Sequence, residues 1–251
     1  MAGTEETGRP TRLLDISMLA LSALLGAGSI VLLAVMGSIR VFNTGWTGSA
    51  PLLWDAALSC AFFLQHSGMV RRPFRARLAR IVRPRYQGAV YSIASGAVLI
   101  LVVLLWQRSE IHLLALTGLP LFVSRALSAL AIAVFIWSAL ALKGFDPLGL
   151  GPIRAHLRGR PDRPPRFVVR GPYRWVRHPL YSCVIVLLWS SPELTADRLL
   201  LNVLWTAWIC VGALLEERDL VAEFGETYLD YRRKVPMLVP WRGPAPERTE
   251  R

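Results

Sequence analysis

The sequence has few charged residues, few acidic residues and little cysteine. Only 18% of its 251 residues are charged, and 17 acidic residues are set against 29 basic ones, which gives a formal net charge of +12. Hydrophobic residues make up 53% of the chain, and its mean hydropathy is +0.41. Such a composition does not fit a disordered basic tail or an ordinary soluble domain, and no nucleic-acid partner is expected. It is typical of a membrane protein whose charges are confined to its loops.

Cysteine clusters and intramembrane charges are also missing. Cys60, Cys183 and Cys210 lie in separate apolar stretches and form no CxxC pair. We therefore expect small buried hydrophobic side chains, with neither a disulfide framework nor a metal site. The apolar segments carry few charges and show no inverted repeat, which disfavours an ion channel, a proton pump or a transporter.

Six apolar segments are present, and crossing a bilayer takes about 20 residues. They span residues 16–39, 52–70, 88–106, 119–142, 179–189 and 199–215. The fold class that they predict is all-α, a polytopic integral membrane helical bundle with five or six spans. The fifth segment is short enough to cross either fully or partly. A turn-like link at 191–197 predicts that the last two segments form a helical hairpin.

The basic residues lie mostly on one side of this arrangement. The N-terminal tail, the loops that follow the second and fourth segments, and the C-terminal tail together hold 25 of the 29 lysines and arginines. The positive-inside rule then predicts that both termini and the two basic loops are cytoplasmic. For most of these arginines, topology and contact with lipid headgroups are a sufficient explanation. The acidic N-terminus lacks the features of a cleaved signal peptide, so we expect the first segment to be retained.

The loop before the fifth segment ends in an unusual basic motif. Arg177 and His178 precede Pro179, a residue suited to the first turn of a helix. Free backbone N–H groups and the positive end of the helix dipole favour a carboxylate or a phosphate at such a position. The alternative is that Arg177 and His178 anchor the helix at headgroup level.

Two adjacent acids, Glu216 and Glu217, follow the sixth segment. Acids at a helix C-terminus oppose the helix dipole, so their presence there calls for an explanation. Either a glutamate pairs with Arg177 or Arg174, or it binds a cationic ligand. The predicted hairpin would bring Glu216 close to His178 in both cases.

These motifs together resemble those of a known family. Arg177-His178-Pro179-x-Tyr181, the apolar hairpin and Glu216-Glu217 resemble the membrane methyltransferases related to isoprenylcysteine carboxyl methyltransferase and phospholipid methyltransferase. The resemblance covers residues 166–241, and it includes Gly171-Pro172-Tyr173-Arg174 and Phe224-Gly225-x-x-Tyr228-x-x-Tyr231-Arg232-x-x-Val235-Pro236. Further motifs are similar to the bacterial branch of methanethiol S-methyltransferases and NnrU-like proteins, namely Gln65-His66-Ser67-x-Met69, Phe145-Asp146-x-Leu148-Gly149-Leu150 and Val235-Pro236-Met237-Leu238.

The resemblance implies S-adenosylmethionine as the methyl donor, bound by the C-terminal part of the chain. The implied cofactor-binding residues are Pro165, Arg166, Phe167, Val168, Tyr173, His178, Pro179, Leu180, Tyr181 and Glu216. Together with the apolar segments, the resemblance predicts four regions: a cytoplasmic N-terminal tail at 1–15, a four-helix membrane region at 16–142, the methyltransferase region at 143–241 and a flexible tail at 242–251. The similarity to a bacterial branch implies a bacterial inner membrane. The helix N-terminus and His178 would receive the methionine carboxylate, Glu216 would pair with the ammonium group, and aromatic rings would contact the adenine or the sulfonium.

The methyl acceptor that we expect is a small thiol or another lipophilic molecule that arrives from the bilayer or from the cytoplasm near it. For its deprotonation, Arg177 could lower the pKa of the thiol, or His178 or Glu217 could accept the proton. Gln65 and His66 are candidate substrate residues, because polar side chains at membrane depth are often functional.

Two departures from the family pattern bear on the acceptor. Gly212 occupies the position of an arginine that the isoprenylcysteine enzymes use for substrate, which argues against a prenylcysteine carboxylate. Methanethiol-type members carry Glu-Arg-Ser-x-Tyr where this chain has Gln87-Gly88-Ala89-Val90-Tyr91. The second departure argues against methanethiol itself. Besides a thiol, we keep two alternatives: carboxyl methylation of an isoprenylcysteine-like or lipid substrate, and a non-catalytic NnrU-like accessory protein.

Overall fold

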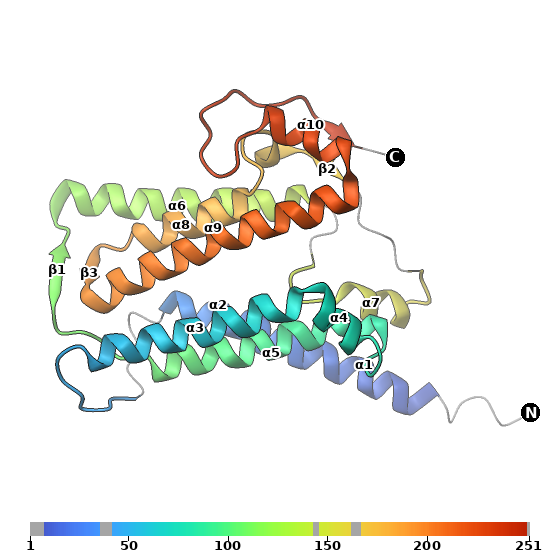
Figure 1. Cartoon of the computed structure of the whole chain (residues 1–251), viewed down its shortest axis with the longest axis horizontal. Coiled ribbons are helices and arrows are strands. Elements are labelled where there is room, and N and C mark those ends of the chain that lie inside the picture. Colours follow the sequence, from blue (N-terminus) through green and yellow to red (C-terminus); the bar gives the residue numbers. More distant parts are fainter. Residues whose placement is uncertain (1–7, 36–41, 143–145, 162–166, 250–251) are drawn as a thin grey trace, which may run out of the picture. The chain divides into compact units, whose positions relative to one another are not determined.

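A computed structural model describes residues 8–35, 42–142, 146–161 and 167–249 of the chain (Figure 1). The chain forms two compact units. The first comprises Met1–Arg108 and Asp146–Pro164, and the second comprises Ser109–Phe145 and Pro165–Arg251. The chain is mostly helical, as the apolar segments predicted.

The first unit is built around helix α5 (Pro84–Leu105). Packed against α5 are α1 (Gly8–Ser22), a π-helical turn (Ala23–Ala27), α2 (Gly28–Val35), α3 (Ala50–Val70) and α7 (Gly151–Leu157). The short helix α4 (Arg72–Leu78) connects α3 to α5. Buried small and polar residues of α5, among them Ser92 and Gly96, let the neighbouring helices approach closely.

A close backbone contact with α5 explains the glycine at position 149, and two hydrogen bonds explain the aspartate at position 146. Gly149 has a φ of +65°, and a Cβ added to it would lie 2.1 Å from the backbone carbon of Gly88 on α5. The Asp146 carboxylate accepts the backbone N–H groups of Leu150 at 2.8 Å and of Gly151 at 2.6 Å. These bonds satisfy donors that the first turn of α7 leaves free. Gly149 therefore holds this loop against α5, and Asp146 joins the loop to the start of α7.

The second unit contains α6 (Gly118–Ala141), a 3-10 turn (Gly171–Arg174), α8 (Pro179–Trp189), α9 (Ala196–Phe224) and α10 (Glu226–Lys234). Helix α8 packs most extensively against α6 and also contacts α9 (Figure 1). Two small antiparallel sheets are additions that the sequence did not indicate. Strand β1 (His112–Ala115) pairs with β3 (Glu193–Thr195), and β2 (Val168–Val169) pairs with β4 (Arg248–Thr249).

Four helical stretches are long and apolar enough to cross a membrane: Thr11–Leu33, Pro84–Leu105, Gly118–Ala141 and Ala196–Phe224. Helix α3 has 21 residues, but polar side chains such as Asp55, Gln65 and His66 lower its hydropathy. Helix α8 has 11 residues and is only about 16 Å long, about half the thickness of the hydrocarbon core.

One sequence-based interpretation needs correction. Glu216 and Glu217 do not lie at a helix C-terminus, because α9 continues beyond the apolar segment to Phe224. The dipole argument for an unfavourable position is therefore wrong. The two carboxylates instead project from successive positions inside a continuous helix, and so they face different surroundings.

Candidate active site

The start of α8 is held by the C-terminal tail of the chain. His178 is the N-cap residue of α8 and Pro179 is its first residue. The backbone N–H of Arg177 donates to the Pro236 carbonyl at 2.9 Å, and that of His178 donates to the Met237 carbonyl at 3.1 Å. The tail thus takes up the two backbone donors just before the helix. An anion at this end would have to use the first turn of α8 and side chains instead.

Arg177 and Glu217 form a buried ion pair. Their Nε and Oε1 atoms lie 2.6 Å apart, and the two side chains are 8% and 3% exposed. The Arg177 guanidinium also donates to the backbone carbonyls of Arg232, at 3.2 Å, and Val235. Arg232 approaches Glu217 from the other side, with Nε 3.5 Å from Oε2. The expected pairing of a glutamate with Arg177 is confirmed, and Glu217 is the partner.

Glu216 lies next to this pair in sequence but faces a cavity. Its side chain is 45% exposed, and Tyr181 donates its hydroxyl proton to Glu216 Oε2 at 2.7 Å. The Nδ1 atom of His178 lies 3.9 Å from the same oxygen, and Nε2 lies 3.3 Å from Glu217 Oε1. The rings of His178 and Tyr181 stack with centroids 5.4 Å apart. His178 therefore lies between an open carboxylate and a buried one.

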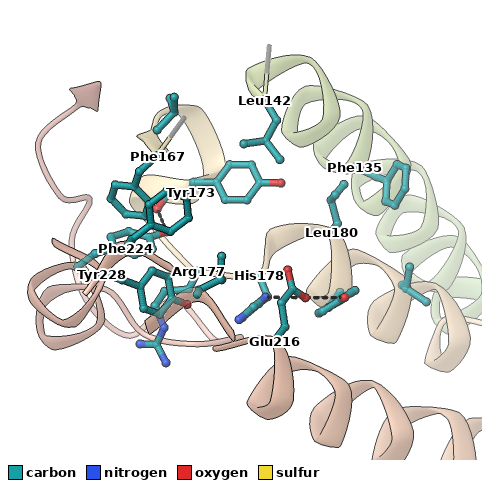
Figure 2. A pocket seen from close by; sticks show the side chains of 15 residues that line it. Phe135, Leu142, Phe167, Tyr173, Arg177, His178, Leu180, Glu216, Phe224 and Tyr228 are labelled. Atoms are coloured by element: carbon teal, nitrogen blue, oxygen red, sulfur yellow. Dashed lines mark hydrogen bonds and ion pairs between the residues drawn. The ribbon is translucent and has the colours of Figure 1, made fainter. Parts of the chain in front are cut away.

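The cavity has a volume of about 510 Å³ and lies within the second unit. This volume falls in the range of small-molecule sites. Phe167, Tyr173 and Phe224 lie on one side of Glu216, and Phe135 and Leu180 lie on the other (Figure 2). The cavity therefore combines an aromatic side, a carboxylate and an apolar side.

The aromatic side is a packed cluster. Phe167 contacts Phe224 and Tyr231 at centroid distances of 5.4 and 5.5 Å. Tyr231 donates its hydroxyl proton to the Tyr173 carbonyl at 2.6 Å, which fixes the 3-10 turn. Burial, with a smaller contribution from the charge of Glu216, raises the pKa of Tyr173 well above its usual value. The Tyr173 hydroxyl therefore remains protonated at neutral pH.

Most of the residues predicted for the site are brought together here. Those lining the cavity are Phe167, Val168, Tyr173, Arg177, His178, Leu180, Tyr181 and Glu216. Pro179 is buried at the start of α8, and Glu217 lies behind the wall in its ion pair. Pro165 and Arg166 lie outside the described residues.

Gln65 and His66 belong to the first unit. The Tyr91 hydroxyl lies 2.7 Å from His66 Nε2, and Gln65 Nε2 lies 3.5 Å from Ser95 Oγ. Both interactions link α3 to α5. Among the residues that the structure describes, no cluster of histidine, cysteine and acidic side chains is suited to a metal ion.

Sequence reasoning missed several residues of the cavity wall. They are Phe135, Leu142, Val184, Leu220, Phe224, Tyr228 and Tyr231. The tail motif contained a usable signal, since Phe224, Tyr228 and Tyr231 recur at helical spacing. No sequence signal distinguishes Phe135 or Leu142 from the other apolar residues of α6.

The fold and the cavity define a helical protein with several candidate membrane spans and an amphiphilic cavity of the size of a small molecule. The chain belongs to the NnrU protein family, whose model matches residues 56–223. It is similar to methanethiol S-methyltransferase 1 of Bradyrhizobium diazoefficiens, with 32% identity over 213 residues, 83% of this chain and 75% of the relative.

Two further relatives extend this comparison. The methanethiol S-methyltransferase of Pseudomonas sp. (strain GM41(2012)) is 34% identical over 215 residues, covering 84% of this chain and 82% of the relative. Nurim of Rattus norvegicus is 28% identical over 188 residues, covering 68% of each. No solved structure matches this chain significantly.

Proposed function

We propose that this chain is an integral membrane methyltransferase that transfers a methyl group from S-adenosylmethionine to a small apolar thiol, with methanethiol as the first candidate. The observation that carries the proposal is the cavity in which Glu216, His178 and Tyr181 lie between an aromatic and an apolar wall. Relatives named methanethiol S-methyltransferase, which cover most of the chain, support the choice of a thiol.

The residues present fit the proposed cofactor. Glu216 offers an accessible carboxylate for an ammonium group, and Tyr181 keeps that carboxylate oriented. Phe167, Tyr173 and Phe224 offer ring faces for the adenine and for a sulfonium, which a π face can stabilise. When bound, S-adenosylmethionine supplies an electrophilic methyl group. Pro165, Arg166, Val168, Pro179 and Leu180 complete the set that the family resemblance implies.

His178 is the proton acceptor that we assign. The reaction forms a bond between the thiol sulfur and the methyl carbon, breaks the bond between that carbon and the donor sulfur, and releases one proton. His178 would take this proton at Nδ1, the nitrogen nearer Glu216, while Glu217 stabilises the imidazolium from the Nε2 side. Glu217 is itself a poor acceptor because Arg177 stabilises its charged form. The apolar side of the cavity excludes water and aligns the reactants.

The proposed topology adds α3 and α8 to the four candidate membrane helices. This gives six spans where α8 crosses fully, an even number that agrees with two cytoplasmic termini, and five where α8 enters only part of the membrane. Helices α8 and α9 form a hairpin in this topology. Both termini and the basic loops would be cytoplasmic, because 25 of the 29 basic residues fall on that side. The similarity to bacterial relatives supports a bacterial inner membrane. The regions 1–15, 16–142, 143–241 and 242–251 keep the roles that the resemblance implies.

The decisive experiment measures cofactor binding and product in the same preparation. Purified protein in detergent is titrated with S-adenosylmethionine by calorimetry. It is then incubated with methyl-labelled cofactor and methanethiol, and labelled dimethyl sulfide is measured by gas chromatography. We expect saturable binding and labelled product. Folded protein that binds no cofactor would overturn the proposal.

A matched pair of variants tests the assignment of Glu216. Glu216→Gln should weaken cofactor binding by about tenfold or more, because a charge-assisted hydrogen bond is lost. Asp219→Asn removes the same charge from an exposed position on α9 and should leave binding unchanged. Equal losses in both variants would mean that only the local charge matters.

A non-catalytic accessory role is the second candidate. One observation favours it: Arg177 and Glu217, two of the three residues predicted to be catalytic, are committed to a buried ion pair that supports the fold. This role predicts a folded protein without cofactor binding, so the same titration distinguishes the two functions.

A further inference from the structure

The segment between α3 and α5 is an isolated concentration of positive charge. Residues 71–85 contain seven arginines and no acidic residue. Within the described part of the chain, Arg85 is the one arginine of the seven that lies within 4.0 Å of a carboxylate, that of Asp15. Arg72, Arg75 and Arg77 on α4 are exposed. The charge of this segment is therefore not neutralised by the protein itself.

Apolar side chains are exposed between these arginines. Phe74 is 37% exposed and Ile81 is 83% exposed. The segment also lies directly before Pro84, where the candidate membrane helix α5 begins. Basic residues interleaved with exposed apolar ones, at the end of a spanning helix, are typical of elements that lie in the lipid interface.

A cavity of about 230 Å³ opens beside the same segment. Its wall is mainly apolar, with Met69 and Val70 from the end of α3 and Leu78 from α4. Arg75 provides the cationic side chain of the wall, and Gln87 a polar one. The cavity lies within the first unit. It offers a place for an acyl chain next to a place for an anionic group.

We propose that α4 and this cavity form a binding site for an anionic phospholipid. The headgroup phosphate would contact Arg75 and the neighbouring Arg72 and Arg77, and the start of an acyl chain would lie against Val70 and Leu78. The positive charge of these arginines favours an anionic lipid over a zwitterionic one, because a zwitterionic headgroup carries no net negative charge. Basic pockets between membrane helices are a recognised type of anionic-lipid site. The site is independent of the proposed methyltransferase activity.

The test is native mass spectrometry of the full chain, released from detergent after titration with phosphatidylglycerol or phosphatidylcholine. We expect stoichiometric retention of phosphatidylglycerol and weak retention of phosphatidylcholine. Arg72→Gln/Arg75→Gln/Arg77→Gln should lower phosphatidylglycerol affinity by about 100-fold at low salt, since each arginine near an anionic surface contributes about five-fold. These side chains are exposed, so the variant should fold normally.

Two controls separate a site from general attraction. Arg154→Gln/Arg158→Gln/Arg160→Gln removes three exposed arginines from the same unit and should change phosphatidylglycerol binding little. Val70→Trp fills the cavity without changing charge and should lower retention of the lipid. Inorganic phosphate should not compete. Equal losses in the two triple variants, equal retention of both lipids, or competition by phosphate would each overturn the proposal.

Discussion

The two compact units bury acidic side chains in different ways. In the first unit Asp15 is 1% exposed, receives the Tyr86 hydroxyl at 2.6 Å and lies 3.3 Å from Arg85 Nε, so the acid joins α1 to α5. In the second unit the buried Glu217 is paired with Arg177, while the preceding residue, Glu216, remains accessible to a cavity. The first arrangement holds helices together. The second holds helices together and also presents a charge to a cavity.

The largest effect that we expect comes from breaking the buried pair of the second unit. Arg177→Met removes the buried ion-pair partner of Glu217 and leaves a buried carboxylate without adequate charge compensation. This should lower the free energy of unfolding by about 3–5 kcal/mol. Thermal unfolding in detergent measures it. Arg177→Met/Glu217→Leu should recover part of the loss, because no uncompensated charge then remains. A single variant as stable as the parent protein would show that the pair is not structural.

The first unit should respond most strongly at its backbone contact. Gly149→Ala places a Cβ against Gly88 at a position with positive φ, so we expect a loss of about 3 kcal/mol. Gly159 has a φ of +62° but open space around it, so Gly159→Ala should cost only about 1 kcal/mol. Both variants carry the cost of a positive φ, so the difference between their losses in melting temperature measures the contact with Gly88 alone. Equal losses would assign the whole effect to backbone conformation.

A smaller effect should separate binding from stability within the second unit. Tyr181→Phe removes the hydrogen bond to Glu216 and should weaken S-adenosylmethionine binding about five-fold, with stability unchanged within about 0.5 kcal/mol. Calorimetric titration and thermal unfolding of the same sample give both quantities. Unchanged affinity together with lower stability would make Tyr181 a structural residue.

An effect of similar size concerns the polar pair of the first unit. Tyr91→Phe removes the hydroxyl that lies 2.7 Å from His66 Nε2 and should cost about 1 kcal/mol of stability. Cofactor affinity should remain at the parental value, so this variant is also the control for Tyr181→Phe. Steady-state kinetics of Tyr91→Phe with methanethiol test whether Gln65 and His66 contact the substrate. A raised KM would support the assignment of Gln65 and His66 to the substrate.

Apolar runs were read correctly where each run corresponds to one helix. The segment at 179–189 matches α8 at both ends, and that at 119–142 matches α6 within one residue. The end of α9 was missed because hydropathy reports contact with apolar surroundings, whereas the helix continues through polar residues to Phe224. The short sheets were missed because strands of two to four residues have too little pattern to be recognised.

The sequence alone determined the six apolar segments, the one-sided distribution of arginines and the candidate residues Arg177, His178, Glu216 and Glu217. These are properties of residue type and spacing. Tertiary structure decided which glutamate is buried. Helix α9 turns each successive side chain to a different direction, so Glu217 meets Arg177 and the tail carbonyls while Glu216 meets Tyr181 and the cavity. No pattern along the chain distinguishes two adjacent identical residues; their neighbours in space do.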